Sequence, residues 1–182
     1  SNGFERVIWL DSDVLIFSPK TFQVTVTRGF EFGREIWVQA SRKGTLEVFY
    51  NVHNAYCLFC ADNKFLDFYQ YACERVISQM ESKANKGMSP QIVGPKLLTS
   101  LNNILKFKLS DDIIMLSPEV LNDLYNGGGD AIDLLKANLK APPSGANLSA
   151  SLTKKYFAKD KYFMDKICEI LLESSHALKQ ES

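Results

Sequence analysis

Two aspartates, Asp11 and Asp13, stand directly after a short apolar run at residues 6–10. Side chains two positions apart on an extended chain point to the same side, so the two carboxylates can converge on one point. Neighbouring carboxylates repel each other, and a divalent cation between them removes that repulsion. Oxygen ligands favour Mg²⁺ or Mn²⁺ over zinc. The alternative is a solvated turn in which the aspartates accept hydrogen bonds from nearby backbone amides.

The run before the aspartates is rich in β-branched and aromatic residues, which predicts a buried strand that ends at the two carboxylates. Open α/β sheets bind ligands at this end of their strands. Further apolar segments predict strands at 14–17, 23–27, 35–39, 46–50, 55–60, 107–109 and 113–116. Capping residues and apolar spacing predict helices at 64–83, 94–105, from 117, 130–139 and 159–178, with a loop at 140–146. The expected fold class is therefore α/β, with a mixed sheet and flanking helices.

Composition describes an ordinary globular domain of 182 residues, with 46% hydrophobic and 23% charged residues. Its 21 basic residues balance 21 acidic ones, so we expect no attraction to nucleic acid or to an anionic membrane. No apolar run approaches the roughly 20 residues of a transmembrane helix, so we expect no membrane segment. Cys57 and Cys60 lie three positions apart in a predicted strand and face opposite sides, which favours free thiols over a metal or redox pair. Free thiols suit a reducing compartment and predict a cytoplasmic location.

Three stretches of the chain resemble the GT-A glycosyltransferases, in particular the sugar-binding-region DXD proteins and their glycogenin-like relatives. Residues 6–19 are similar to the DXD signature of these families and read RVIWLDSDVLIFSP. Residues 51–56, NVHNAY, followed by an apolar strand and the helix start at 65–69, resemble the segment that contributes an asparagine to the transferred sugar. Residues 94–99, GPKLLT, resemble the start of a helix on the acceptor side. The resemblance extends over residues 6–118.

The resemblance implies a hexosyltransferase-like enzyme of glycan biosynthesis. Such an enzyme transfers a sugar from a nucleotide-diphosphate donor to a glycan or another acceptor. Asp11 and Asp13 would hold Mn²⁺ or Mg²⁺ and, through it, the donor diphosphate. Asn54 would bind the hydroxyls of the donor sugar. Gly94 and Pro95 would lie on the acceptor side.

The chain departs from this family pattern in two places. These enzymes often take a third metal ligand, commonly a histidine, from near the C-terminus, and the histidines of this chain are His53 and His176. The DXD also follows a nucleotide-binding half in these enzymes, whereas ten residues precede Asp11 here. We therefore expect residues 1–182 to be a single domain that is part of a GT-A domain. Within it, residues 4–118 would form the DXD-containing core and residues 119–182 a helical C-terminal part.

Two other interpretations remain open. Haloacid-dehalogenase-like phosphatases also begin with an apolar strand and DXD, and in that case Asp11 would be the nucleophile, with Asp111-Asp112 as an acidic pair. The chain can also be an inactive fragment or a binding module that keeps the DXD. Trp37, on a predicted strand, can stack on a sugar ring, although we expect it in the core.

Overall fold

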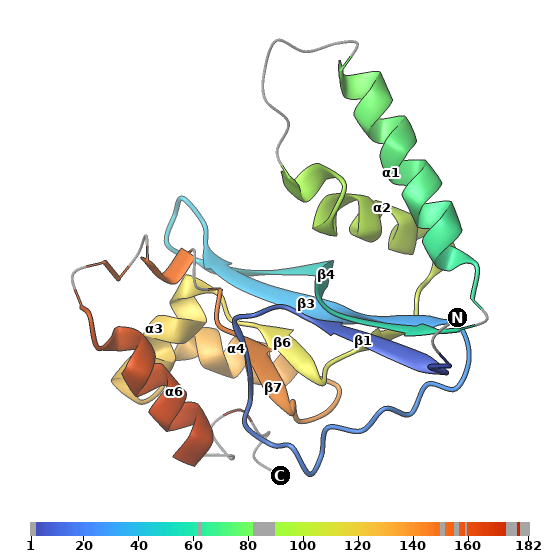
Figure 1. Ribbon diagram of the computed structural model, residues 1–182. Helices are drawn as coiled ribbons and strands as arrows, with labels where there is room; N and C mark the ends of the chain where they lie inside the picture. Colours follow the sequence, from blue (N-terminus) through green and yellow to red (C-terminus); the bar gives the residue numbers. More distant parts are fainter. Residues whose placement is uncertain are drawn as a thin grey trace.

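The computed structural model describes residues 3–61, 63–81, 90–149, 152–154, 157, 158, 160–173 and 178. It confirms a mixed α/β architecture with two sheets and helices on both sides (Figure 1). The larger sheet has the strand order β1-β4-β3-β5, in which only the β3–β5 pair is parallel. Its strands are β1 (Arg6–Leu10), β3 (Phe30–Ala40), β4 (Leu46–Cys60) and β5 (Leu109–Ser110).

A smaller sheet has the order β2-β7-β6 and contains β2 (Val14–Ile16), β6 (Ile113–Met115) and β7 (Gly145–Asn147). β7 pairs antiparallel with β2 and parallel with β6. Segments from both sides of the predicted division at residue 118 therefore share one sheet. The chain passes from the larger sheet to the smaller one at Asp11–Asp13, between β1 and β2.

The helices lie in two groups on opposite sides of the β3–β4 hairpin (Figure 1). One group contains α1 (Phe65–Glu81), the short 3₁₀ helix η1 (Pro90–Ile92) and α2 (Pro95–Leu105). The other contains α3 (Pro118–Asn126), α4 (Asp130–Asn138) and α6 (Phe163–Glu173). No helix within the described ranges is long and apolar enough to cross a membrane.

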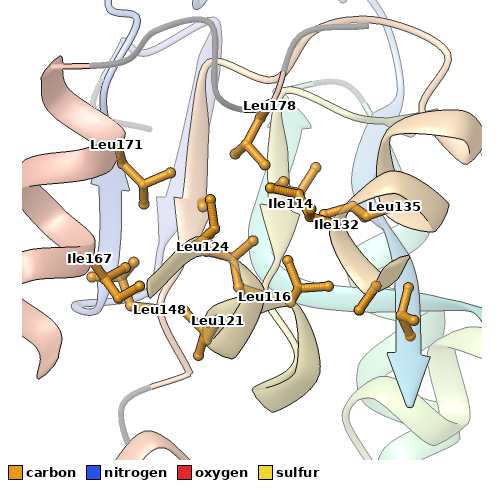
Figure 2. Packing of buried hydrophobic residues seen from close by; sticks show 14 of the residues in the cluster. Ile114, Leu116, Leu121, Leu124, Ile132, Leu135, Leu148, Ile167, Leu171 and Leu178 are labelled. Atoms are coloured by element: carbon orange, nitrogen blue, oxygen red, sulfur yellow. The ribbon is translucent and has the colours of Figure 1, made fainter. Parts of the chain in front are cut away.

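The largest apolar cluster lies between α3, α4, α6 and the sheets (Figure 2). Aliphatic side chains dominate it, and the residues labelled in Figure 2 are Ile114, Leu116, Leu121, Leu124, Ile132, Leu135, Leu148, Ile167, Leu171 and Leu178. A separate, aromatic-rich cluster joins α1 and α2 to the hairpin through Phe65 and Leu98. These two clusters fix the hairpin from both sides, which makes it a rigid base for a site.

The predicted starts of α2 and α3 are confirmed, and each helix has a proline in its first turn. α2 begins at Pro95, and α3 begins at Pro118 with the Ser117 hydroxyl accepting a hydrogen bond from Val120 N. The predicted strands at 35–39, 46–50 and 55–60 are parts of longer elements, because β3 has 11 residues and β4 runs without a break for 15.

Two predicted elements are wrong. Residues 23–27 form no strand, although Val26 is buried against Tyr56 and Leu58, so their apolar alternation reflects packing without strand pairing. Residues 145–147 lie in β7, whereas 140–146 is a loop by prediction. Gly145 allows this close pairing, because a Cβ there would lie 2.7 Å from the Ile113 side chain and 2.8 Å from Leu15 O.

The prediction that β1 is buried is also wrong. β1 is the outermost strand of its sheet, and Val7 and Trp9 are 55% and 60% exposed. Ile8, on the opposite face, is half-buried against the cluster around Tyr56. The apolar composition of the run predicted the strand correctly, but its place at the sheet edge decides its exposure.

Candidate functional site

A cavity of about 550 Å³ lies where the end of β1, the β3–β4 hairpin and the start of α2 meet. This volume is within the range of small-molecule sites. Most of the side chains around it are polar: Asp11, Glu35, Trp37, Asn51, His53, Asn54, Ala55, Gln91, Pro95, Lys96, Thr99, Ser100, Met115 and Leu152.

The cavity brings together residues from the three stretches that sequence analysis singled out. Asp11, Asn54 and Pro95 line it, and so does His53. Asp13 lies two residues after Asp11 and Gly94 directly precedes Pro95, but neither lines the cavity. His176 lies outside the described residues.

The position of Asn54 follows from an irregularity in the β3–β4 pairing. His53 pairs with Gly33 and Cys57 pairs with Phe32, so residues 54–56 of β4 have no register partner on β3. Extra residues of this kind bend a strand and redirect its side chains, and they are common beside active sites. Asn54 thereby lines the cavity although it belongs to a continuous strand.

Asp11 is held in place by backbone and side-chain contacts. Its backbone N donates to Ala55 O at 3.0 Å, and its Oδ1 accepts a hydrogen bond from Trp9 Nε1 at 2.9 Å. Val14 N donates to Asp11 O at 3.1 Å and closes a turn over residues 11–14. The extended geometry expected for Asp11 and Asp13 is therefore wrong, because the chain turns here to enter the second sheet.

Asp13 is tied to a different element. Its Oδ1 accepts a hydrogen bond from Asn147 Nδ2 at 2.8 Å, and its backbone O accepts one from Leu148 N at 3.0 Å. Asn147 Oδ1 in turn accepts a hydrogen bond from Ser149 N at 2.7 Å, which fixes the amide orientation. The side chain that approaches the DXD from the later part of the chain is thus an asparagine, and no sequence pattern pointed to it.

Asp11 and Asp13 are the acids of the predicted cation site. Within the described ranges, no group of three or more His, Cys, Asp or Glu side chains could hold a metal ion. Mg²⁺ commonly uses one or two carboxylates together with substrate phosphates and water. Asp11 and Asp13 would supply at most two such carboxylates.

His53 is a buried, neutral histidine in the cavity wall. Its ring packs on Gly33, where a Cβ would come within 2.0 Å of Nε2. Nε2 lies 2.9 Å from Ile113 O, and a carbonyl only accepts, so Nε2 carries the proton. Nδ1 is then an acceptor, without a hydrogen-bond partner among the described residues. Burial lowers the pKa of His53 to about 4.

Another part of the cavity wall consists of Glu35, Trp37 and Asn51, of which sequence reasoning missed Glu35. Glu35 and Asn51 are register partners, and Trp37 lies two residues after Glu35 on the same strand. The predicted core position of Trp37 is incorrect, because its half-buried ring lines the cavity. The turn at residues 41–45, which sets the hairpin register, is the signal that could have found this group.

The α2 helix forms the remaining wall of the cavity. Thr99 Oγ1 accepts a hydrogen bond from Val52 N at 2.9 Å, and buried Leu98 packs in the same cluster as Val52. These contacts hold Pro95 and Lys96 at the cavity edge.

Comparison with protein-family models, curated proteins and solved structures finds no match for this chain.

Proposed function

We propose that this chain is a metal-dependent glycosyltransferase with a GT-A fold. It transfers a sugar from a nucleotide-diphosphate donor to a glycan or another acceptor. The observation that carries the proposal is the cavity of about 550 Å³, in which Asp11, Asn54 and Pro95 meet although they are far apart in sequence. Each of the three comes from a separate stretch that resembles these transferases.

The chemistry of the cavity wall supports a sugar as ligand. Asp11 and Glu35 present hydrogen-bond acceptors, while the amides of Asn51 and Asn54 both donate and accept. A sugar offers several hydroxyl donors in a small volume. Several hydrogen-bond acceptors close together match the hydroxyl donors of a sugar. They match a purely anionic ligand less well, because such a ligand offers no donors.

In this mechanism, Asp11 and Asp13 would hold the cation, and the Trp9 indole N–H orients the Asp11 carboxylate. The Asn147 side-chain amide orients the Asp13 carboxylate. Mg²⁺ or Mn²⁺, when bound, would neutralise charge that develops on the departing diphosphate. Asn54 hydrogen-bonds hydroxyls of the donor sugar.

The phosphatase interpretation has less support. Its acidic pair would be Asp111-Asp112, but neither residue lines the cavity that contains Asp11. Asp111 is buried and forms an ion pair with Arg34 at 2.5 Å. Asp112 Oδ2 accepts a hydrogen bond from the Ser110 hydroxyl at 2.8 Å. These partners give both residues a structural role away from Asp11.

Isothermal titration calorimetry with Mn²⁺ and a panel of nucleoside diphosphates tests the proposal. We expect Mn²⁺-dependent binding of one diphosphate, weakened by Asp13→Ala at least about 100-fold. Asp13→Asn keeps the side-chain shape and separates loss of charge from loss of packing. Asp67→Ala, at an exposed acid of α1, is the matched control and should bind as the parent does.

Circular dichroism establishes that each variant is folded. The proposal is overturned if no nucleoside diphosphate binds in the presence of Mn²⁺, or if folded Asp13→Ala and Asp13→Asn both bind like the parent. Trapping of a phosphorylated Asp11 by a phosphoryl donor would favour the phosphatase instead.

A further inference from the structure

The cavity extends well beyond the end that Asp11 occupies. The backbone hydrogen bond of 3.0 Å from Asp11 to Ala55 places Asp11 beside that residue of β4. Asn51 lines the same cavity four residues earlier on the strand. Four residues of extended strand span up to about 13 Å, which is longer than one pyranose ring. Asp11 and Asn51 therefore line different parts of one cavity.

The far end presents an aromatic ring in a fixed orientation. Trp37 lines the cavity and is half-buried. Its Nε1 donates to Gln39 Oε1 at 3.2 Å, so the polar edge of the indole already has a partner. The C–H groups of a pyranose pack well on an aromatic face, because that face carries partial negative charge.

A carboxylate and an amide lie beside this ring. Glu35 precedes Trp37 by two residues and shares its face of β3. Asn51, directly opposite in register, hydrogen-bonds the Glu35 side chain. Among the described residues, Glu35 forms no ion pair. Burial raises the pKa of Glu35, so the fold keeps a carboxylate where it is unfavourable without a ligand.

We propose that Glu35, Trp37 and Asn51 form an acceptor subsite for a pyranose ring, which makes the acceptor a carbohydrate. This inference rests on the proposed transferase for its reaction, but binding at the subsite needs no donor. The ring stacks on Trp37, and its hydroxyls donate to Glu35 and bond to Asn51. Two polar partners and one aromatic face define both the position and the orientation of the sugar.

The two tryptophans of the chain allow each end of the cavity to be observed separately. In Trp9→Phe, all tryptophan fluorescence comes from Trp37 at the far end. In Trp37→Phe, it comes from Trp9, whose indole bonds Asp11. Each variant is titrated with the methyl pyranosides of glucose, galactose, mannose and N-acetylglucosamine, and then with Mn²⁺ and nucleoside diphosphates.

We expect a saturable fluorescence change in Trp9→Phe with at least one pyranoside and no change in Trp37→Phe with the same sugar. Adding Glu35→Gln to Trp9→Phe should weaken sugar binding about tenfold, because a hydrogen bond to a charged group is lost. Asp67→Ala in the same background changes an exposed acid of α1 and should leave sugar binding unchanged.

The subsite is overturned if no pyranoside gives a saturable signal from Trp37, or if folded Glu35→Gln binds the sugar as tightly as its parent. Failure of the subsite is distinct from failure of the transferase proposal. The transferase proposal is tested by binding of the nucleoside diphosphate, which Trp9 fluorescence and calorimetry measure. If the nucleoside diphosphate binds and no pyranoside changes Trp37 fluorescence, the transferase proposal stands and the acceptor subsite is rejected. A sugar signal without diphosphate binding leaves a carbohydrate-binding site and removes the transferase.

Discussion

Five acids of this molecule form two groups that differ in their partners. The first group, here called the core acids, contains Glu31, Asp111 and Asp123. Arg34 donates to Asp111 from two nitrogens, at 2.6 and 2.5 Å, and Lys140 N donates to it at 2.7 Å. Each core acid likewise has a cation or backbone N–H groups as partners.

The second group, the cavity acids, contains Asp11 and Glu35. The partners that the structure gives their side chains are neutral, the Trp9 indole for Asp11 and the Asn51 amide for Glu35. Neither forms an ion pair within the described part of the chain. The comparison therefore separates acids with cationic or backbone partners from cavity acids whose partners are neutral. The cavity acids are the ones that the proposed function assigns to a ligand.

The largest predicted effect is on a core acid. Asp111→Ala leaves the Arg34 guanidinium, 12% exposed, without its bidentate partner. We expect the free energy of unfolding to fall by about 3–5 kcal/mol, measured by urea denaturation. Asp67→Ala on the surface of α1 is the control and should change it by less than about 1 kcal/mol. Equal changes in the two variants would mean that Asp111 stabilises the fold no more than a surface acid does, and Asp111 would then not be a core acid.

The sequence predicted the cavity only in part, and the reason is visible in particular residues. Asp11 follows an apolar run, and Asn51, Asn54 and Pro95 belong to stretches that resemble known glycosyltransferases. Glu35 belongs to no such stretch, because it meets Asn51 only through the hairpin register. That register follows from the turn at 41–45, where Ser41 N donates to Thr45 O at 2.8 Å and Gly44 has φ of +81°.

The difference between local sequence signals and tertiary contacts also explains which elements were predicted. The helices α2 and α3 carry their signals locally, as a proline in the first turn and, for α3, the Ser117 cap. β7, with the sequence Gly-Ala-Asn, has no apolar period and forms because β2 and β6 lie on either side of it. Exposure of Trp9 is likewise a property of the sheet order. Tertiary neighbours decide such positions, and a single sequence does not display them.

A second prediction concerns His53, the titratable base in the cavity wall. Burial lowers its pKa from 6.5 to about 4, so the unfolded chain binds a proton over that interval and the folded chain does not. Stability is therefore present at neutral pH and is lost as pH falls from 6.5 to about 4. The expected loss is on the order of 3 kcal/mol.

Urea denaturation at several pH values, in buffer with a chelator, measures this loss in the parent and in His53→Gln. The variant cannot titrate at this position, so its free energy of unfolding should vary less across the same interval. An identical pH dependence in both proteins would mean that His53 titrates normally, and the cavity wall would then be open to water.

The smallest predicted effect sharpens the comparison most, because its sign differs from that of the core acids. Burial raises the pKa of Glu35 above 4.5, so its contribution to stability is present at low pH and is lost as pH rises through the folded-state pKa. Glutamine does not ionise, so Glu35→Gln does not lose stability as pH rises. The variant should therefore be slightly more stable than the parent at pH 7, with no gain below pH 4.5, in thermal unfolding at the two pH values. If Glu35→Gln is more stable than the parent at pH 7, the charged Glu35 side chain does not stabilise the fold. If Glu35→Gln is less stable at pH 7, Glu35 belongs with the core acids.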